Sequence, residues 1–192
     1  IDRPLSYYQN MYKELNPSGI LKILVAELDI KLLVETYEKE ISTVKDEYKA
    51  RKYKHDNGIN KMNEDKYLAK QKQDEEEIKR LEKKLEHYEE IRREDGDLIT
   101  LGGIIYMIYN KEILSLFGGS YDKYMEFQSF YTIHWELIKY ALNNGFEKYK
   151  FYGITWDAKN TQDELYGRYD FKRGVGGHVG DYIRGVDPII TK

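Results

Sequence analysis

The feature that most constrains the fold is a charged stretch, residues 30–97, in which mainly apolar residues recur at alternating steps of three and four. In its first half these positions are Ile30, Val34, Tyr37, Ile41, Val44 and Tyr48. In its second half they are Tyr67, Gln71, Asp74, Ile78, Leu81, Leu85 and Tyr88. This spacing is the a/d pattern of a two-stranded coiled coil. The stretch therefore predicts two long helices that pack against each other.

The two helices are predicted to be antiparallel, because a short turn separates them. Residues 55–60 contain an Asn-Gly step, which is typical of a turn. Asp29 and Asn63 precede the two helices and can accept N-cap hydrogen bonds. Gln71 and Asp74 stand at seam positions that favour apolar side chains, so we expect the far end of this hairpin to be less tightly packed and mobile.

Charge is unevenly distributed along the hairpin, although the whole chain has a net charge of only −3. Residues 49–72 hold eight basic and three acidic side chains, whereas residues 73–97 hold six basic and eleven acidic ones. A basic tip can contact a phosphate backbone, and charged side chains also simply solvate an exposed coiled coil. Both interpretations stay open here. The candidate nucleic-acid contacts are Lys52, Lys54, Lys61 and Lys66.

The flanking residues predict an α/β (α+β) domain with a mixed sheet, into which the hairpin is inserted. Its predicted strands are residues 20–28, 98–109, 112–117, 149–154 and 179–183, with a tight turn at Asn110-Lys111. Ser129 can cap a helix whose apolar positions are expected to face the sheet, and a short helix is predicted around 165–171. Those apolar positions are Ile133, Leu137, Ile138, Ala141 and Leu142. The predicted domains are residues 1–29 and 98–192 for the body, and 30–97 for the arm.

Several classes of site are excluded by composition and spacing. The chain has no cysteine, which rules out disulfides and thiolate metal sites. Its four histidines are scattered and predict no metal cluster, and His134, on a helix, is expected to be packed or half-exposed. No Ser-His-Asp pattern or phosphate-binding Walker loop is found. No apolar run approaches the ~20 residues of a membrane span, so a soluble cytoplasmic chain is expected.

One short segment has an unusual composition, Phe171-Lys172-Arg173-Gly174-Val175-Gly176-Gly177-His178. Two adjacent cations precede three glycines in four positions. Glycines let backbone N–H groups approach a ligand closely, and a lysine beside them can stabilise an oxyanion or a phosphate. A flexible turn with two surface cations has the same composition, so the pattern alone leaves both readings open.

Taken in order, several blocks of sequence resemble the FemABX family. They are Phe117-Gly118-Gly119-Ser120, Trp135-Glu136-Leu137-Ile138-Lys139-Tyr140-Ala141, Tyr149-Lys150-Phe151-Tyr152-Gly153-Ile154, and Tyr166-Gly167 followed by Phe171-Lys172-Arg173-Gly174. The helical hairpin before them resembles the arm of the FemA-like branch. The resemblance covers essentially the whole chain.

The resemblance implies two tandem acetyltransferase-like (GNAT) domains, with the arm inserted in the second, to which this chain would contribute. It implies transfer of glycine, alanine or serine from aminoacyl-tRNA to a lipid-linked or UDP-linked peptidoglycan precursor, without a metal or organic cofactor. It also implies a peripheral contact with the inner face of the membrane. A first domain is expected to be missing, so this chain alone is expected to be inactive.

The family's Phe-Lys motif falls on Phe171-Lys172, which implies that Lys172 stabilises the negative charge formed in acyl transfer. The implied substrate-binding residues are Phe171, Arg173, Gly174, Gly176 and Tyr152. The chain departs from the family pattern at Val175, Lys150, Gly180 and Arg184-Gly185, which puts the pocket floor and the choice of amino acid in doubt. Two alternatives remain: a non-catalytic RNA-binding coiled-coil module, and a coiled-coil scaffold on a degenerate base.

Overall fold

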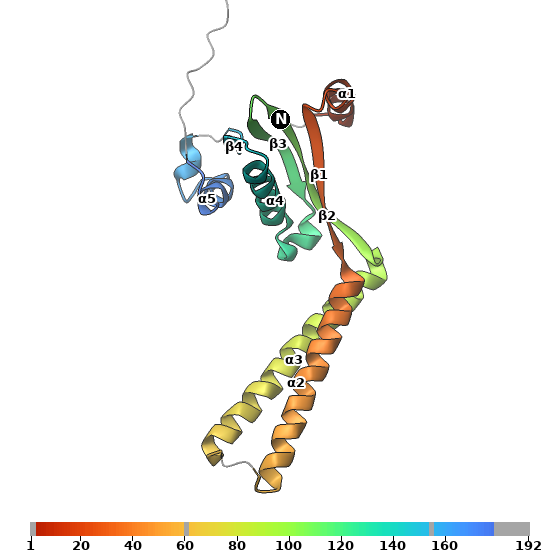
Figure 1. The fold of residues 1–192 in the computed structure, drawn as a ribbon, viewed down its shortest axis with the longest axis vertical. Coiled ribbons are helices and arrows are strands. Elements are labelled where there is room, and N and C mark those ends of the chain that lie inside the picture. The colour runs from red at the N-terminus through yellow and green to blue at the C-terminus, as the bar shows by residue number, and fades with distance from the viewer. Residues whose placement is uncertain (1–2, 60–61, 154–155, 179–192) are drawn as a thin grey trace, which may run out of the picture. The chain divides into compact units, whose positions relative to one another are not determined.

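The computed structural model describes residues 3–59, 62–153 and 156–178 and contains both helices and strands (Figure 1). Its elements are α1 (Leu5–Leu15), β1 (Leu21–Asp29), α2 (Ile30–Asp56), α3 (Glu64–Asp95), β2 (Leu98–Tyr109), β3 (Glu112–Ser120), η1 (Asp122–Phe127), α4 (Ser129–Asn143), β4 (Lys148–Lys150), η2 (Trp156–Lys159) and α5 (Tyr166–Gly174). The chain divides into two compact units. The first comprises residues 1–24, 103–119 and 131 onward, and the second comprises 25–102 and 120–130.

The strands form one mixed sheet in the order β1-β2-β3-β4, which confirms the predicted α/β class. β2 and β3 are joined by the two-residue turn at Asn110 and Lys111, whose φ angles of 46° and 61° are both positive, as a type I′ hairpin turn requires. β4 pairs parallel to β3, with Ile113 opposite Tyr149. The predicted strand 98–109 and the predicted β-hairpin that it forms with the next strand are therefore confirmed.

Helix α4 buries Ile133, Leu137 and Ala141 in the first unit, as predicted, but Leu142 is 70% exposed. The prediction for Leu142 is wrong because, at 100° per residue, it lies about 180° around the helix from Ile133. His134, which is 2% exposed, belongs to the buried face instead. The buried face of α4 therefore includes the imidazole of His134, which a pattern of apolar residues alone does not predict.

Other elements also differ from the sequence-based expectation. β4 ends at Lys150, not 154, and β3 continues through Gly118-Gly119 to Ser120. The amphipathic helix α1 was not predicted; its Tyr8 ring packs edge-on against Phe117, with 5.3 Å between centroids. The predicted strand 179–183 lies outside the described residues.

The second unit contains the antiparallel arm, in which α2 and α3 pack along the predicted seam. Val34 and Ile41 of α2 and Leu81 and Tyr88 of α3 are buried, and Ile91 extends the seam beyond its predicted end. Both predicted N-caps are confirmed. The Asp29 side chain accepts a 2.8 Å hydrogen bond from the Leu32 N–H, and that of Asn63 accepts one of 2.8 Å from the Asp65 N–H.

The base of the arm has its own small core, which also includes residues from η1. Tyr124 is buried with residues of α2, α3 and β2, namely Ile30, Val34, Tyr88, Ile91, Ile99 and Leu101. Lys123 donates to Glu94 at 2.9 Å and to Asp95 at 2.7 Å, and His87 lies 2.6 Å from Glu126. Segment 120–130 is therefore part of the same compact unit as the arm, although it follows β3 in sequence. The predicted domain boundaries at residues 29 and 97 stay a prediction.

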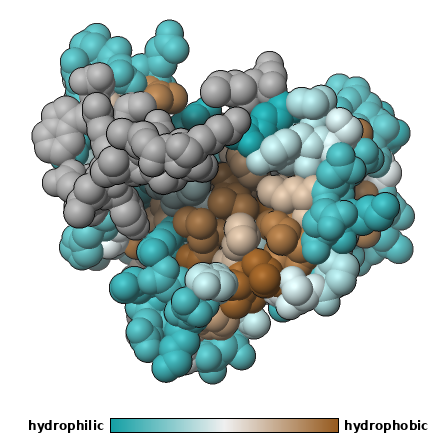
Figure 2. Space-filling view, turned by 90° about the horizontal axis from the view of Figure 1, so that it is seen from above, coloured by the Kyte–Doolittle hydropathy of each residue, from teal (hydrophilic) through white to brown (hydrophobic). Residues whose placement is uncertain are grey.

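Some large apolar side chains of the protein are exposed to solvent. Figure 2 shows apolar side chains gathered in a hollow on the face that it draws, with hydrophilic side chains around it. Within the described part of the chain, no helix combines the length and the apolarity that crossing a membrane requires.

Candidate functional site

Lys172 lies in the last turn of α5, where its side chain reaches the segment that follows β4. Its Nζ donates to the backbone carbonyls of Tyr152, at 3.3 Å, and Gly153, at 3.1 Å. The side chain is partly buried, so the ammonium is withdrawn from solvent and held at a defined place between two segments that are about twenty residues apart in sequence.

The backbone conformation of Tyr152 explains how the successive carbonyls of Tyr152 and Gly153 both accept hydrogen bonds from the Lys172 ammonium. Tyr152 has a φ of 63°, in the left-handed region, which costs a non-glycine residue roughly 1–2 kcal/mol. This conformation turns the chain two residues after the end of β4. Tyr152 is 60% exposed, and its contact with Lys172 runs through its backbone carbonyl.

The surroundings of Lys172 disfavour its charged form. Burial lowers the pKa of the Lys172 amine below its usual value of 10.5, and the nearby charge of Arg168 lowers it further. Desolvation acts in this direction because it penalises the ammonium more than the neutral amine. A perturbed pKa of this kind, on a group with fixed geometry, is typical of functional sites and also occurs in structural networks.

Aromatic rings surround the residue that precedes Lys172. The centroid of Phe171 lies 4.7 Å from that of Tyr131, 5.0 Å from that of His134 and 6.2 Å from that of Phe151. Tyr131 and His134 come from α4, whereas Phe151 follows β4. Phe171 therefore anchors α5 against both elements, and in the structure it is a packing residue.

His134 makes a polar contact inside this aromatic cluster. Its Nδ1 lies 2.6 Å from the Tyr149 hydroxyl oxygen. Burial lowers the pKa of His134 to about 4, with the charge of Lys172 as a second cause, so the imidazole is neutral at physiological pH. Burial raises the pKa of the Tyr149 phenol, against the opposite effect of a hydrogen bond with Ser115.

The glycines after Lys172 form the C-cap of α5. The Gly177 N–H donates to the Lys172 carbonyl and the Gly176 N–H to the Arg173 carbonyl, each at 2.9 Å. With a φ of 83° at Gly176, these two bonds make a Schellman motif. A Cβ at Gly177 would lie 2.5 Å from the Lys172 carbonyl oxygen, which explains the glycine. These two N–H groups are used by the cap and do not point toward a ligand.

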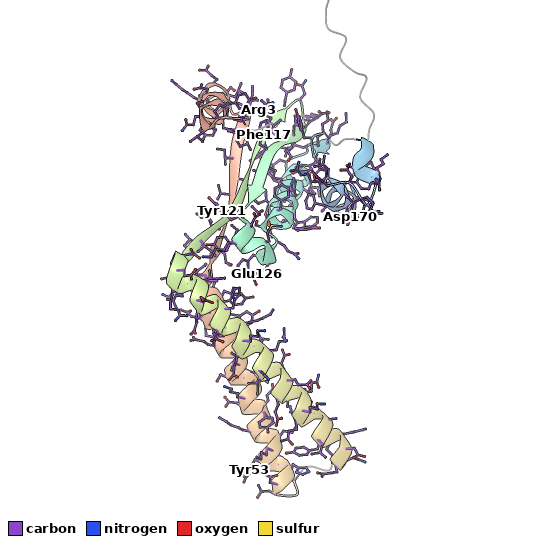
Figure 3. All side chains as sticks on the ribbon, turned by 180° about the vertical axis from the view of Figure 1, so that it is seen from behind. Arg3, Tyr53, Phe117, Tyr121, Glu126 and Asp170 are labelled. Atoms are coloured by element: carbon purple, nitrogen blue, oxygen red, sulfur yellow. The ribbon has the colours of Figure 1, made fainter. Side chains whose placement is uncertain are left out.

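Arg173 and Gly174 are exposed at this end of α5. The Arg173 guanidinium donates to Asp170, one turn earlier on the same helix, at 2.7 Å, and Asp170 is labelled in Figure 3. Arg173 is therefore paired with Asp170 on the surface of its own helix.

The arm tip, where Tyr53 is labelled in Figure 3, carries the candidate lysines of the second unit. Lys52, Lys54 and Lys66 are exposed and form no ion pair with another described residue, whereas Lys61 lies outside the described residues. Arg51 and Lys70 instead contact the buried Asp74, Lys70 at 2.9 Å. The hairpin therefore uses some of its basic residues internally and leaves these three lysines facing solvent.

Comparison with known proteins decides the family. A model of the FemAB family matches residues 1–190. The chain belongs to the FemAB family. This FemAB-family chain is 26% identical to the aminoacyltransferase FemA of Staphylococcus epidermidis over 192 residues, which cover 97% of the chain and 44% of the relative. It is 33% identical to the aminoacyltransferase FemB of the same organism over 112 residues, covering 56% of the chain and 26% of the relative.

The fold is also shared with a solved structure. A crystal structure of FemX matches 90% of the chain with a TM-score of 0.69 and 23% sequence identity, and the match covers 42% of the FemX chain. The predicted membership in the FemABX family is thus confirmed, whereas the GNAT-like assignment stays a prediction. The chain spans less than half the length of the relatives it matches.

Proposed function

We propose that the whole protein containing this chain is an aminoacyltransferase that moves glycine, alanine or serine from aminoacyl-tRNA to the stem peptide or cross-bridge of a peptidoglycan precursor. The relatives FemA and FemB, named as aminoacyltransferases, support the reaction class. The observation that carries the proposal is the desolvated Lys172 ammonium, held by the carbonyls of Tyr152 and Gly153.

The transfer reaction requires a group that stabilises the negative charge formed transiently on the carbonyl oxygen of the ester. An amine of the acceptor attacks the ester carbonyl carbon of the aminoacyl-tRNA and forms a tetrahedral oxyanion. The ester C–O bond then breaks, the ribose hydroxyl leaves with the proton that the amine gives up, and an amide bond remains. Lys172 has three N–H donors, and two of them bond backbone carbonyls, so one donor is left for the oxyanion.

We assign the substrate contacts to the surface around this ammonium. The exposed Tyr152 ring offers an apolar face to the acceptor peptide, and Arg173 offers a cation that can exchange Asp170 for a carboxylate or phosphate of the substrate. Phe171 fixes the position of α5, and Gly174 and Gly176 keep its end free of side chains. No metal or cofactor takes part in this scheme.

We assign binding of the tRNA backbone to Lys52, Lys54, Lys61 and Lys66 on the arm. Three of these side chains are exposed and form no ion pair within the described residues, which favours contact with an external polyanion. The alternative function is a non-catalytic RNA-binding module. It is favoured by the same lysines and differs from the first proposal in giving Lys172 no part in chemistry.

The test is to change Lys172 in the whole protein and weigh the muropeptide formed from charged tRNA. Lys172→Ala is expected to lower kcat roughly 100–1,000-fold, as removal of an oxyanion donor does. Lys172→Arg keeps a cation of different shape and is expected to restore only part of the rate. Lys13→Ala, at an exposed position on α1, serves as the control. Unchanged transfer in Lys172→Ala would discard the catalytic assignment.

A further inference from the structure

His134 lies in the aromatic cluster around Phe171, the residue before Lys172, although no part of the proposed chemistry uses it. It is 2% exposed. Its ring centroid lies 5.0 Å from that of Phe171, on α5, and 5.2 Å from that of Phe151, after β4. One imidazole therefore contacts both of the segments whose meeting holds the Lys172 ammonium.

The orientation of this ring is fixed by a polar contact on its other side. His134 Nδ1 lies 2.6 Å from the Tyr149 hydroxyl, and Tyr149 packs against Phe151 with 4.9 Å between centroids. Tyr149 also sits on β4, opposite Ile113 of β3, so it is anchored to the sheet. The imidazole is thus tied to the sheet through Tyr149 and presents its ring to α5.

We infer that His134 is a positioning residue for the proposed reaction: its ring, held by Tyr149, joins α5 to the segment after β4 and so places the Lys172 ammonium beside the carbonyls of Tyr152 and Gly153. This inference rests on the proposed function of Lys172. A displacement of about 1 Å at a reacting group can cost roughly a hundredfold in rate, so the quality of this packing matters to the chemistry.

The same geometry argues against a role for His134 as general base. The residue is almost completely buried, and its Nδ1 is occupied by Tyr149. A general base has to come within hydrogen-bond reach of the substrate proton or of one intervening water. The neutral state of the ring fits its neighbourhood, because a second cation beside Lys172 would repel it.

The first experiment uses His134→Ala in the whole protein, with Ile104→Ala as a control that removes a buried side chain from β2 in the same unit. In His134→Ala, kcat for transfer is expected to fall about tenfold or more, with KM for both substrates within about threefold of wild type. The pKa of the Lys172 amine, followed by NMR of labelled lysine Nζ and assigned with Lys172→Arg, is expected to rise, because water enters the space left by the ring. Ile104→Ala is expected to lower the Tm and leave the pKa of Lys172 in place.

A second variant distinguishes a packing role of the His134 ring from a chemical role of its imidazole. His134→Phe with Tyr149→Phe keeps two rings and removes both hydrogen-bonding groups, so the pair is expected to fold and keep at least about half of kcat. The inference is overturned if this pair is folded, keeps the pKa of Lys172 and yet loses transfer, because the imidazole then acts chemically. It is equally overturned if His134→Ala leaves the Lys172 pKa unchanged, or if Ile104→Ala shifts it as much. The NMR measurement stands by itself, so failure of the catalytic assignment in Lys172→Ala is a separate result.

Discussion

At the scale of single residues, backbone conformation decides what the segment around Lys172 can do. Tyr152 accepts a positive φ and thereby turns two carbonyls toward the lysine, while Gly176 and Gly177 close the C-terminus of α5 with two hydrogen bonds. The glycines that suggest an open ligand loop in the sequence are explained by this cap. Their conformational freedom serves the helix end that carries Lys172.

Gly177→Ala tests this role of the cap. The new Cβ would meet the Lys172 carbonyl oxygen at 2.5 Å, so the end of α5 has to shift, and we expect a loss of roughly 1–3 kcal/mol in stability together with reduced transfer. Gly174→Ala is the matched control, because a Cβ there meets nothing within 4 Å and Ala is the better helix former. Thermal unfolding of both variants measures the difference. Equal Tm values for the two variants would contradict this account of the cap.

At the scale of elements, the arm combines an apolar seam with a polar layer near its tip. Asp74 is 5% exposed and contacts Arg51 and Lys70, while the Gln71 amide donates to the Tyr48 hydroxyl at 3.0 Å. The sequence marks the positions of Gln71 and Asp74 as weak points of the seam. In the structure they have partners on both helices, and a buried ion pair of this kind can fix the register of two helices.

Asp74→Ala is expected to destabilise the arm by about 3 kcal/mol, because it leaves Arg51 partly buried without its carboxylate. Replacing both partners, with Arg51→Met and Asp74→Leu, is expected to recover most of this loss. Lys45→Ala, which removes an ion pair exposed on both sides, is the control and is expected to cost less than about 1 kcal/mol. Urea unfolding followed by circular dichroism measures all three. A double variant as unstable as Asp74→Ala would show that the charges themselves are required.

At the scale of the whole molecule, each of the two compact units holds one candidate site. The unit with α4 and α5 holds Lys172, and the unit with the arm holds the exposed lysines of the tip. The second unit also includes segment 120–130, which Tyr124 and Lys123 fasten to the base of the arm. This segment leads directly into α4, so the chain connects the arm's unit to the helix that carries His134.

Neutralising the exposed tip lysines tests the proposed contact with tRNA. Changing Lys52, Lys54 and Lys66 to Gln is expected to weaken tRNA binding and to reduce the slope of log affinity against log salt by about 2 to 3. The control variant carries Lys79→Gln and Lys83→Gln, which remove exposed lysines from the acidic half of the arm. Binding measured at several salt concentrations separates the two variants. If affinity and slope both stay at the wild-type values, these lysines only solvate the arm.

The arm, its caps, the hairpin turn and the family were accessible from the sequence alone. Helix periodicity, an N-cap and an Asn-Lys turn depend on residues a few positions apart, so the local pattern is enough to predict them. The same reasoning placed Leu142 on the buried face of α4, although helix geometry puts it about 180° from Ile133, and the prediction was wrong. The positive φ of Tyr152, two residues after the end of β4, was not accessible, because a tyrosine gives no local signal for it.

By itself, the sequence determined the order of the helices and most of the strands, and it singled out Lys172 through its resemblance to a family. Only the tertiary structure placed the Lys172 ammonium beside the carbonyls of Tyr152 and Gly153, packed the preceding Phe171 against rings from α4 and from the segment after β4, and tied His134 to Tyr149. These contacts join residues 15 to 20 positions apart. They depend on how side chains pack and lose water, and a pattern of neighbouring residues does not encode that.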